Sequence, residues 1–548
     1  MPRMRFSALG ITAGMNSDFP ANQLDPRAAP NLSNVQVRRG FMRPRFGLAT
    51  FANRPNNDPV IKLAAARYEN GGADLFRIKN RSTGTLGEIR LLNGTTWDAI
   101  ASDAGLAVAN GVLLGNDLNP WDSATVLSKP IFVNGVNENV YYDPGVNLKP
   151  LGGNKSRYVI QYQNRTFLAY QDAGAGFVAN QIQSSAPGTF NTFTGVGSVQ
   201  TQLRDDPFPI TGLSVNRRFT VYKERSIIVG TPVGQASQPV RYETINTAGV
   251  GLWAPGTLAK LGSFDAFLGS DDFYTFDATG APQPLASPIR ELLLGGINYD
   301  RLAQTHALHD PENGEVVWFI PMGEDRFAKD AWVWNYRLNA WWHWQFSAEM
   351  GASAAFPSVV GLTYDSAGAM GLTYDTASFS YDDMSAVSSK LSMIVGEAGE
   401  DVGASTTYGR TLRFDPATHA DAFNVPANVA WFYDLPAIDL ESVSFDENRQ
   451  PIRALRAKDW KTLDQVDIIY KDLGGAVPSV VCEVSVDEGN SYTTFDTQTL
   501  SVVGGGVRTK SFFGRVAGQR LQVRISGVAT DFAIRDIVLY ITTSGGGR

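Results

Sequence analysis

The sequence has a single cysteine, four histidines and no long apolar run among its 548 residues. One cysteine excludes an intrachain disulfide and a zinc site built on cysteines. Cys482 lies in the run SVVCEVSV and is interpreted as a small buried apolar residue. Residues 1–20 lack an adequate apolar stretch after Arg3 and Arg5, so we expect no secretory signal. Because nowhere do about 18 apolar residues follow one another, we expect no transmembrane helix and a soluble chain made in a reducing cytoplasm.

Short runs with the pattern of β-strands make up most of the sequence. The chain has 54 glycines and 28 prolines, which interrupt helices and mark turns. Between them lie short runs rich in Val, Ile, Phe and Tyr, bounded by turn signals such as Asn93-Gly94 and Asn134-Gly135. This punctuation predicts an all-β fold. Repeated strand pairs with weak internal similarity favour a β-propeller over a barrel, and roughly six to eight blades would fit the length.

The pattern divides the chain into three parts. Residues 1–58 are dense in Pro, Asn and Arg and are expected to form an extended, Arg-rich N-terminal arm. Residues 59–430 are assigned to the β-propeller, with a Tyr-Asp repeat loop at 361–384 whose Asp residues are expected to cap turns. Calcium binding by this loop is the alternative, although its spacing is not that of a known calcium loop. Residues 431–548 contain four strand patterns and are predicted to form a β-sandwich-like domain.

Charge is unevenly distributed along a chain of net charge −7. Residues 1–54 hold eight Arg, no Lys and two Asp, and residues 501–548 hold seven basic and two acidic residues. Basic ends on an acidic body favour surfaces that contact acidic partners, including neighbouring copies of the chain. The alternative is that the Arg side chains merely solvate strand edges.

The densest basic cluster is predicted to contact a neighbouring subunit or partner. It consists of Arg38, Arg39, Arg43 and Arg45. Phosphate binding is the alternative, but a chain with a net charge of −7 is a poor general DNA binder, because affinity depends on neutralising several phosphates.

The sequence contains few of the motifs that are typical of catalytic or metal-binding sites. His306 and His309 with Asp310 have a spacing that would need a helix to make a metal pair, so a surface pair is favoured. The sequence contains no GxSxG elbow, P-loop or HExxH helix. A hydrolytic carboxylate pair across a propeller mouth stays open. The carboxylates considered for it are Asp271, Asp272, Asp300, Glu324 and Asp325. We expect no catalytic, metal or cofactor site, and a protein that is not an enzyme.

Two further motifs are interpreted as structural. Trp332 and Trp334 alternate on one predicted strand, and Trp342 and Trp344 alternate on the returning strand. Core packing of this hairpin is favoured over a stacking platform for sugars or bases. The segment Ser485 to Phe495, SVDEGNSYTTF, resembles the Asp-box turn of sialidase-like propellers, in which Ser and Asp side chains bond a hairpin backbone. Such a turn stabilises a hairpin and is not a catalytic device.

Several stretches, in order, resemble the tail nozzle or tail hub proteins of short-tailed bacteriophages, also known as packaged-DNA stabilisation proteins. They are NLSNVQVRRGFMRPRFGL, RYVIQYQNRTFLAYQ, QIQSSAPGTFNTF, VYKERSIIVG, AFLGSDDFYTFDATGAPQPLASPIRELL and AWVWNYRLNAWWHWQF. The Tyr-Asp repeat follows the last of them, and the resemblance covers about residues 30–385.

The resemblance implies a structural subunit of the virion tail. Such a subunit forms a ring, commonly a homohexamer, below the portal and adaptor. The ring retains packaged double-stranded DNA and passes it during ejection, without sequence specificity, and its outer surface holds fibres or spikes. An acidic channel wall would let DNA slide. The competing hypothesis is a receptor-binding or glycan-degrading β-propeller protein, and a third is a propeller scaffold for protein partners.

Overall fold

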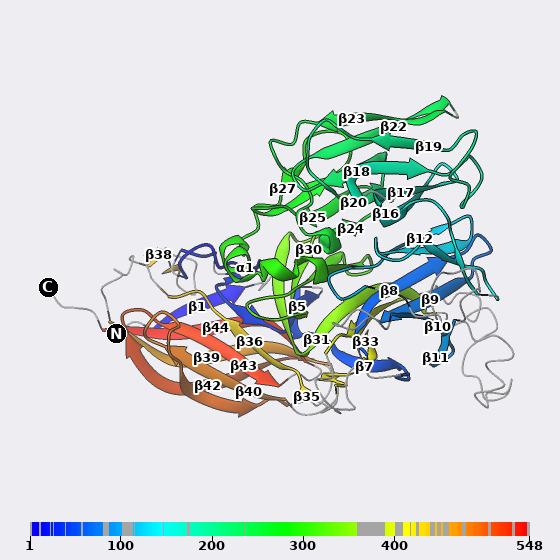
Figure 1. Ribbon diagram of the computed structural model, residues 1–548. Helices are drawn as coiled ribbons and strands as arrows, with labels where there is room; N and C mark the ends of the chain where they lie inside the picture. Colours follow the sequence, from blue (N-terminus) through cyan, green and yellow to red (C-terminus); the bar gives the residue numbers. More distant parts are fainter. Residues whose placement is uncertain are drawn as a thin grey trace.

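The computed structural model describes most of the chain, and nearly all of the regular secondary structure in that part is β-strand (Figure 1). It covers residues 3–544 except for 10–12, 22, 26, 39, 56–57, 80–86, 101–112, 114, 146, 173–175, 236, 359–389, 400–408, 417, 424–426, 439–443, 446–450, 453–459, 474–477, 502–505 and 529–531. Its one α-helix in the described ranges is the short α1 (Arg290–Gly296), and two 3-10 turns are η2 (Pro255–Thr257) and η3 (Tyr299–Gln304). No helix in these ranges is both long and apolar enough to span a membrane.

Five separate sheets follow one another along the chain, each with four antiparallel strands in sequence order. The first contains β8 (Val60–Arg67), β9 (Ala73–Lys79), β10 (Glu88–Asn93) and β11 (Thr96–Ala99). The second contains β12 (Asp122–Val126), β13 (Lys129–Val133), β14 (Val140–Tyr142) and β15 (Leu148–Pro150). The third contains β16 (Lys155–Tyr162), β17 (Arg165–Asp172), β18 (Phe177–Ser184) and β19 (Val199–Gln202). The fourth contains β20 (Ile210–Val215), β21 (Phe219–Lys223), β22 (Ile227–Gln235) and β23 (Gln238–Ile245). The fifth contains β24 (Ala259–Lys260), β25 (Asp265–Leu268), β26 (Phe273–Phe276) and β27 (Gln283–Pro284).

Tight turns set the registers of these hairpins. Leu127 and Ser128 join β12 to β13, and Gln163 and Asn164 join β16 to β17. All four residues have positive φ, between 47° and 61°. Positive φ at both central residues matches the right-handed twist of the flanking strands. A two-residue turn therefore fixes which side chains of each sheet face its neighbours.

An eleven-stranded sheet closes the circle. It contains β28 (His306–Asp310), β29 (Glu315–Ile320), β30 (Ala328–Asn335), β31 (Ala340–Ser358), β32 (Lys390–Glu397), β33 (Thr411–Asp415), β7 (Gly47–Ala52), β34 (Ala420–Asp421), β35 (Ala427–Asn428), β2 (Gly14–Met15) and β3 (Ala28–Ala29). The first part of β31 pairs with β30 and its second part with β32. The sheet thus holds two more four-stranded groups, β28 to β31 and β31-β32-β33-β7. With the five separate sheets they make seven units.

Apolar clusters join each unit to the next. Phe76 of the first unit packs edge-on against Phe132 of the second, with ring centroids 5.1 Å apart. Phe167 of the third packs on Phe219 of the fourth at 4.9 Å. The cluster that joins the seventh unit to the first contains Val60, Leu63, Ala352 and Ile394. Side chains on both faces of a sheet are buried in this arrangement, which explains strands as apolar as β29. The predicted all-β propeller is confirmed.

A two-sheet sandwich follows the propeller and includes strands from both ends of the chain (Figure 1). One sheet contains β42 (Val507–Gly518), β39 (Trp460–Asp472), β44 (Phe532–Ser544), β6 (Phe41–Pro44), β5 (Val35–Arg38) and β1 (Arg3–Leu9). The other contains β4 (Leu32–Ser33), β36 (Ala430–Asp434), β43 (Gln522–Val528), β40 (Ser479–Ser485) and β41 (Thr493–Thr499). A short hairpin of β37 (Ser444–Phe445) and β38 (Pro451–Ile452) stands apart from both sheets. Val466, Cys482 and Ile525 are buried in the shared core, and burial raises the pKa of the Cys482 thiol.

The N-terminal segment is extended, as expected, but it is paired with the rest of the fold. Its strands β1, β4, β5 and β6 belong to the sandwich, and β7 is the outermost strand of the seventh propeller unit. Gly47 is the first residue of β7. Only glycine fits there, because a Cβ would lie 2.3 Å from the carbonyl oxygen of Ala420. The segment therefore ties the sandwich to the closure of the propeller.

Candidate binding site on the propeller axis

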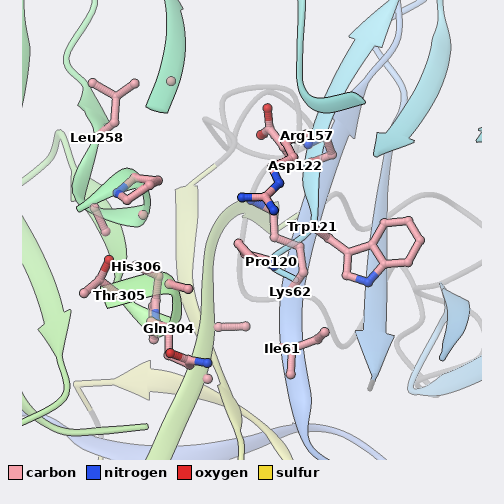
Figure 2. Close-up of a pocket in the computed structure, with 18 of the residues that line it drawn as sticks. Ile61, Lys62, Pro120, Trp121, Asp122, Arg157, Leu258, Gln304, Thr305 and His306 are labelled. Carbon is pink, nitrogen blue, oxygen red and sulfur yellow. Dashed lines mark hydrogen bonds between the residues drawn. The ribbon is translucent and has the colours of Figure 1, made fainter. Parts of the chain in front are cut away.

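The first strand of every propeller unit borders one cavity. Residues of β8, β16, β20, β24, β28 and the second part of β31, with those at the start of β12, line a volume of about 360 Å³. Figure 2 shows Gln304, Thr305 and His306 on one side of it, and Ile61, Lys62, Asp122 and Arg157 on the other. The side chains that line it come from seven different units, so the cavity lies on the axis of the propeller.

His306 carries a buried hydrogen-bond acceptor in the wall of this cavity. Its ring stacks on Phe319 with centroids 4.5 Å apart, and its Nδ1–H donates to the carbonyl oxygen of Gln304 at 3.4 Å. Burial lowers the pKa of His306 to about 3, and the nearby charge of Lys62 lowers it further. The imidazole is therefore neutral at physiological pH. Because Nδ1 carries the proton, the buried Nε2, which bonds nothing in the described part of the chain, is an acceptor.

Gln304 and Thr211 add two buried polar atoms without a partner. Gln304 is 4% exposed, and its Nε2 donates to the carbonyl oxygen of Asp117 at 2.9 Å. That bond fixes the amide, and its Oε1 has no partner among the described residues. Thr211 is 8% exposed, and its hydroxyl is likewise unpartnered within the described ranges. A buried polar atom with no hydrogen bond costs about 1–3 kcal/mol, so such atoms need an explanation where several gather.

The cavity also holds positive charge. Lys62 on β8 forms no ion pair or hydrogen bond with any side chain that the structure describes, and burial lowers the pKa of its ammonium group. Asp122 acts on it only through electrostatic attraction, and Lys260 repels it. Arg157 on β16 stacks over the Tyr170 ring at 4.3 Å. These two cations come from neighbouring parts of the wall (Figure 2).

Both carboxylates of the wall are already engaged. Asp122 accepts the backbone N–H groups of Ser123 and Val159, each at 2.9 Å. Asp117 accepts ion pairs from Arg301 at 3.2 Å and from Arg326 at 2.6 Å. Asp122 thus joins the first strands of two units, and Asp117 joins the segment before β12 to the sixth unit. Their charges hold the wall together.

The backbone closes tightly beside these groups. A Cβ at Gly256 in η2 would lie 1.7 Å from the carbonyl oxygen of Thr305, so only glycine fits. The Trp318 indole N–H donates to the carbonyl oxygen of Thr257 at 2.8 Å, which anchors η2 to the aromatic core. Gln304 and His306 therefore project from a rigid part of the wall.

The predicted histidine pair is not a surface pair. His306 and His309 lie three residues apart on β28, so they face opposite sides of the strand. His306 lines the axial cavity, whereas the Nε2 of His309 lies 3.3 Å from the Tyr336 hydroxyl. The described residues contain no group of three or more side chains suited to a metal ion.

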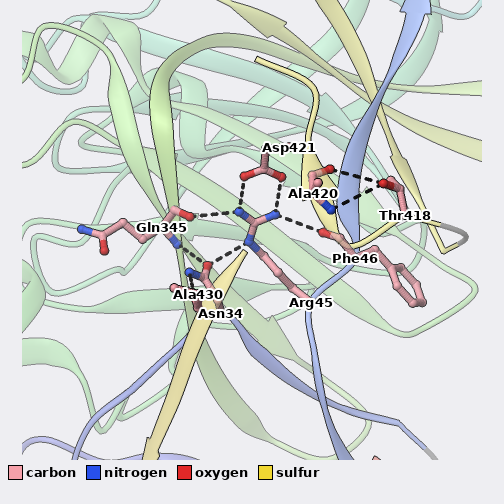
Figure 3. A network of polar contacts seen from close by, with 8 residues as sticks. All are labelled: Asn34, Arg45, Phe46, Gln345, Thr418, Ala420, Asp421 and Ala430. Carbon is pink, nitrogen blue, oxygen red and sulfur yellow. Dashed lines mark hydrogen bonds and ion pairs between the residues drawn. The ribbon is translucent and has the colours of Figure 1, made fainter. Parts of the chain in front are cut away.

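The prediction of a partner contact is wrong for Arg45. Its guanidinium is 1% exposed and forms a bidentate ion pair with Asp421, at 2.9 and 2.6 Å (Figure 3). Its other N–H groups donate to the Asn34 side chain and to the carbonyl oxygens of Phe46 and Gln345. The sequence of an Arg-rich run does not distinguish an arginine that faces solvent from one that pairs with a buried carboxylate 376 residues away.

The other three arginines of the cluster differ among themselves. Arg38 is partly exposed, stacks on Phe46 at 4.4 Å, and donates to the Gln36 side chain at 3.1 Å. Arg43 is partly exposed on β6. Arg39 lies outside the described residues. For Arg38 and Arg43 a contact with another subunit stays a prediction.

The tryptophan hairpin lies in the core. Trp332, Trp334, Trp342 and Trp344 are each between 1% and 5% exposed. The two pairs lie on opposite faces of the hairpin, because Trp334 is opposite Trp341 in the register and Val333 is opposite Trp342. The cross-strand stacking partner of Trp332 is His343, with ring centroids 4.6 Å apart.

The turn after β40 has the geometry expected of an Asp-box. The Ser485 hydroxyl accepts the N–H of Gly489 at 2.8 Å, and an Asp487 oxygen accepts that of Ser491 at 2.9 Å. The hydroxyl groups of Ser491 and Ser485 also donate to the Asp487 carboxylate, and these bonds, with that of the Ser491 N–H, lower the pKa of Asp487 to about 2. The turn joins two strands of the sandwich. The Tyr-Asp loop at 361–384 lies outside the described residues.

The carboxylates singled out from the sequence do not line the axial cavity. Asp271 accepts the Tyr274 hydroxyl at 2.9 Å, and the Ser287 hydroxyl bonds Asp272. Sequence reasoning missed Lys62, Arg157, Thr211 and Gln304. The signal that could have found three of them is a polar residue within the first strand of a unit, as in VIKLAA, KSRYVI and ITGLSV.

Comparison with known proteins gives distant structural likeness alone. No family model and no curated protein sequence matches the chain. An exo-β-1,3-galactanase from Phanerochaete chrysosporium, solved with galactose, is 8% identical, with a TM-score of 0.28, over 90% of this chain and 100% of that one. An arabinoxylan arabinofuranohydrolase of glycoside hydrolase family 43 from Bacillus subtilis, in complex with cellotetraose, is 10% identical, with a TM-score of 0.22, over 98% of this chain and 99% of that one.

These structures correct one expectation. The sequence led us to expect that the chain is not an enzyme, whereas both similar structures are of enzymes that degrade glycans. That expectation is withdrawn. Because both TM-scores lie below 0.5, the likeness supplies neither a substrate nor a mechanism for this chain.

Proposed function

We propose that the protein is a glycan-recognising β-propeller whose axial cavity binds a sugar unit. The observation that carries the proposal is the set of buried polar atoms without a partner in the described wall: Gln304 Oε1, His306 Nε2 and Thr211 Oγ1. A bound molecule that supplied hydrogen bonds to them would remove the cost of their burial. The cavity volume of about 360 Å³ lies in the range of small-molecule sites.

A sugar fits this set because each of its hydroxyl groups both donates and accepts. Gln304 Oε1 and His306 Nε2 accept, the Lys62 ammonium donates, and the Thr211 hydroxyl does either. Tyr158 and Phe327 add aromatic surface to the same wall. A purely apolar ligand would leave all of these polar groups unpaired.

Binding is tested with the purified full chain and a panel of simple sugars. The panel contains galactose, glucose, arabinose, galacturonate and glucuronate, and affinity is measured by isothermal titration calorimetry. Gln304→Leu should weaken binding of the best sugar by about 10- to 100-fold, because it removes one acceptor from a buried site. Gln283→Leu, on the exposed outer strand β27, is the matched control and should bind as the wild type does.

The same incubations are repeated with polysaccharides and analysed chromatographically for released sugar. Release that is lost in Gln304→Leu and kept in Gln283→Leu would extend the proposal to glycan cleavage at this cavity. Equal affinity of wild type and Gln304→Leu for every sugar that binds, or no binding at all, would refute the proposal.

A second candidate is a tail nozzle subunit of a short-tailed bacteriophage, and the ordered resemblance over residues 30–385 favours it. Under this candidate the partners are further copies in a hexameric ring, the adaptor protein, tail fibres or spikes, and the DNA that passes through. The protein would then belong to the virion tail. The edge strand β42, with Phe513 61% and Val507 50% exposed, offers a surface for a neighbouring copy.

Mass photometry of the purified chain, followed by negative-stain imaging with an adaptor protein, tests this candidate. A ring supports it, and a chain that stays monomeric with the adaptor present contradicts it. The two proposals are compatible, because a tail subunit that recognises a surface glycan would satisfy both.

A further inference from the structure

We infer that the axial cavity selects an anionic sugar, one that carries a carboxylate or a phosphate, with the anion held by Lys62. This inference rests on the proposed function and adds the chemical class of the ligand. It depends on the charges of the wall, whereas the proposed function depends on its uncharged polar atoms.

Lys62 is a positive charge of the wall that forms no ion pair with any carboxylate in the described ranges. It lies on β8 in the interior of the propeller, and in the described part of the chain no carboxylate forms an ion pair with it. Asp122, the acid whose charge acts on it, already accepts two backbone N–H groups at 2.9 Å. Lys62 is partly buried, and a charge shielded from water without a counter-ion is costly, so the site favours a ligand that supplies one.

Basic residues outnumber acidic ones in the lining as a whole. Asp117 is the other acidic residue of the wall, and two cations, Arg301 and Arg326, bond it. Lys260 and Arg157 are further basic residues of the lining. The lining itself therefore holds three basic residues and two carboxylates, and both carboxylates are already engaged, which gives a positive local potential in a cavity walled by protein.

Lys62 also stands beside the uncharged polar groups. Its charge acts on His306, whose Nε2 is a buried acceptor of the wall, and both residues line the same cavity (Figure 2). One ligand can thus place its anion against the ammonium group while its hydroxyl groups bond Gln304, Thr211 and His306. Neutral sugars would satisfy the second set and could accept a hydrogen bond from Lys62, but they would leave its charge without a counter-ion.

The experiment compares sugars that differ only at carbon 6. The two trios are galactose, galacturonate and galactose 6-phosphate, and glucose, glucuronate and glucose 6-phosphate, titrated calorimetrically into the full chain. The wild type should bind at least one anionic member about tenfold or more tightly than its neutral counterpart, since a charge-assisted bond in a shielded site contributes about 1.5–3 kcal/mol. Whichever anion shows the preference identifies the group as carboxylate or phosphate.

Lys62→Met keeps the length of the side chain and removes its charge, so the preference should collapse to about equal affinities. Lys155→Met changes the net charge equally at an exposed position on β16 and should keep the preference. Thermal unfolding of both variants, followed by circular dichroism, verifies that the propeller is intact. If Lys62→Met does not fold, Lys62→Gln replaces it in the same comparison.

The outcomes separate the two proposals. Equal affinity of neutral and anionic members in the wild type, or a preference that survives the loss of the Lys62 charge, overturns the anionic selection and leaves the sugar site standing. No binding of any of the six compounds overturns both.

Discussion

Removing the Arg45 guanidinium is expected to destabilise the whole fold, although Arg45 does not line the axial cavity. All five of its N–H groups have acceptors: Asn34, two carboxylate oxygens of Asp421, and two backbone carbonyl groups. These acceptors belong to the N-terminal segment, to β31 and to β34. Arg45 therefore joins the N-terminal segment to two strands whose bonded residues lie 300 and 376 residues later in the chain (Figure 3).

The expected loss follows from the burial of this ion pair. Arg45 and Asp421 side chains are 1% and 6% exposed. Removing one partner of such a pair costs about 3–5 kcal/mol, because the other charge stays buried without compensation. Arg45→Met and Asp421→Leu should each lose about this much. The double variant buries no charge, so its loss should be smaller than the sum of the two by about 1–3 kcal/mol.

The free energy of unfolding is measured by guanidinium chloride denaturation, followed through tryptophan fluorescence. Arg27→Met is the matched control, because Arg27 forms the same bidentate pair with Asp25 at an exposed site. It should unfold close to the wild type, since solvent screens exposed pairs. Single variants of Arg45 and Asp421 that unfold within about 1 kcal/mol of the wild type would refute the reasoning.

Two further predictions concern pH. Burial raises the pKa of Glu315 to about 7, so its charge costs nothing below about pH 4.5 and its full cost of about 3 kcal/mol is reached above pH 7. Glu315→Gln should therefore raise the free energy of unfolding at pH 8 and not at pH 4, and an equal effect at both contradicts this. Hydrogen bonds lower the pKa of Asp487 to about 2, so its stabilisation is complete above about pH 4 and is lost as the pH falls towards 2. Asp487→Ala should destabilise the turn at pH 6 and have a much smaller effect at pH 2, where about half of the Asp487 carboxyl groups are protonated, measured by hydrogen exchange of the Ser491 amide.

The all-β class and the repeated units could be predicted because their signals are local. Turn residues such as Asn93-Gly94 and alternating apolar positions act within one hairpin, and each hairpin of the propeller forms between strands that are neighbours in sequence. The Asp-box turn at Ser485 and Asp487 was predictable for the same reason, since all its bonds lie within a few residues. The core position of Cys482 follows from its apolar neighbours.

The role of the N-terminal segment could not be predicted, because its partners are distant. β7 pairs with β33, more than 350 residues later, and β1 pairs with β44 near the other end of the chain. Nothing in the composition of an Arg-rich segment distinguishes a docking arm from strands of the chain's own sheets. Arg45 illustrates this, because the carboxylate that decides its role, Asp421, lies in a short strand with no motif.

The axial site escaped prediction because no two of its key residues are neighbours in one motif. Lys62, Arg157 and Thr211 are each a single polar residue in an otherwise strand-like run, and the sequence pattern alone gives such residues an exposed edge position. Closure of the propeller turns these predicted exposed positions towards the axis. The first strands of the units converge, so polar groups that would be solvated on an open sheet face one another across a cavity of about 360 Å³. Closure by β7 therefore creates the site as well as the fold, and loss of the Arg45 anchor beside β7 should weaken sugar binding together with stability.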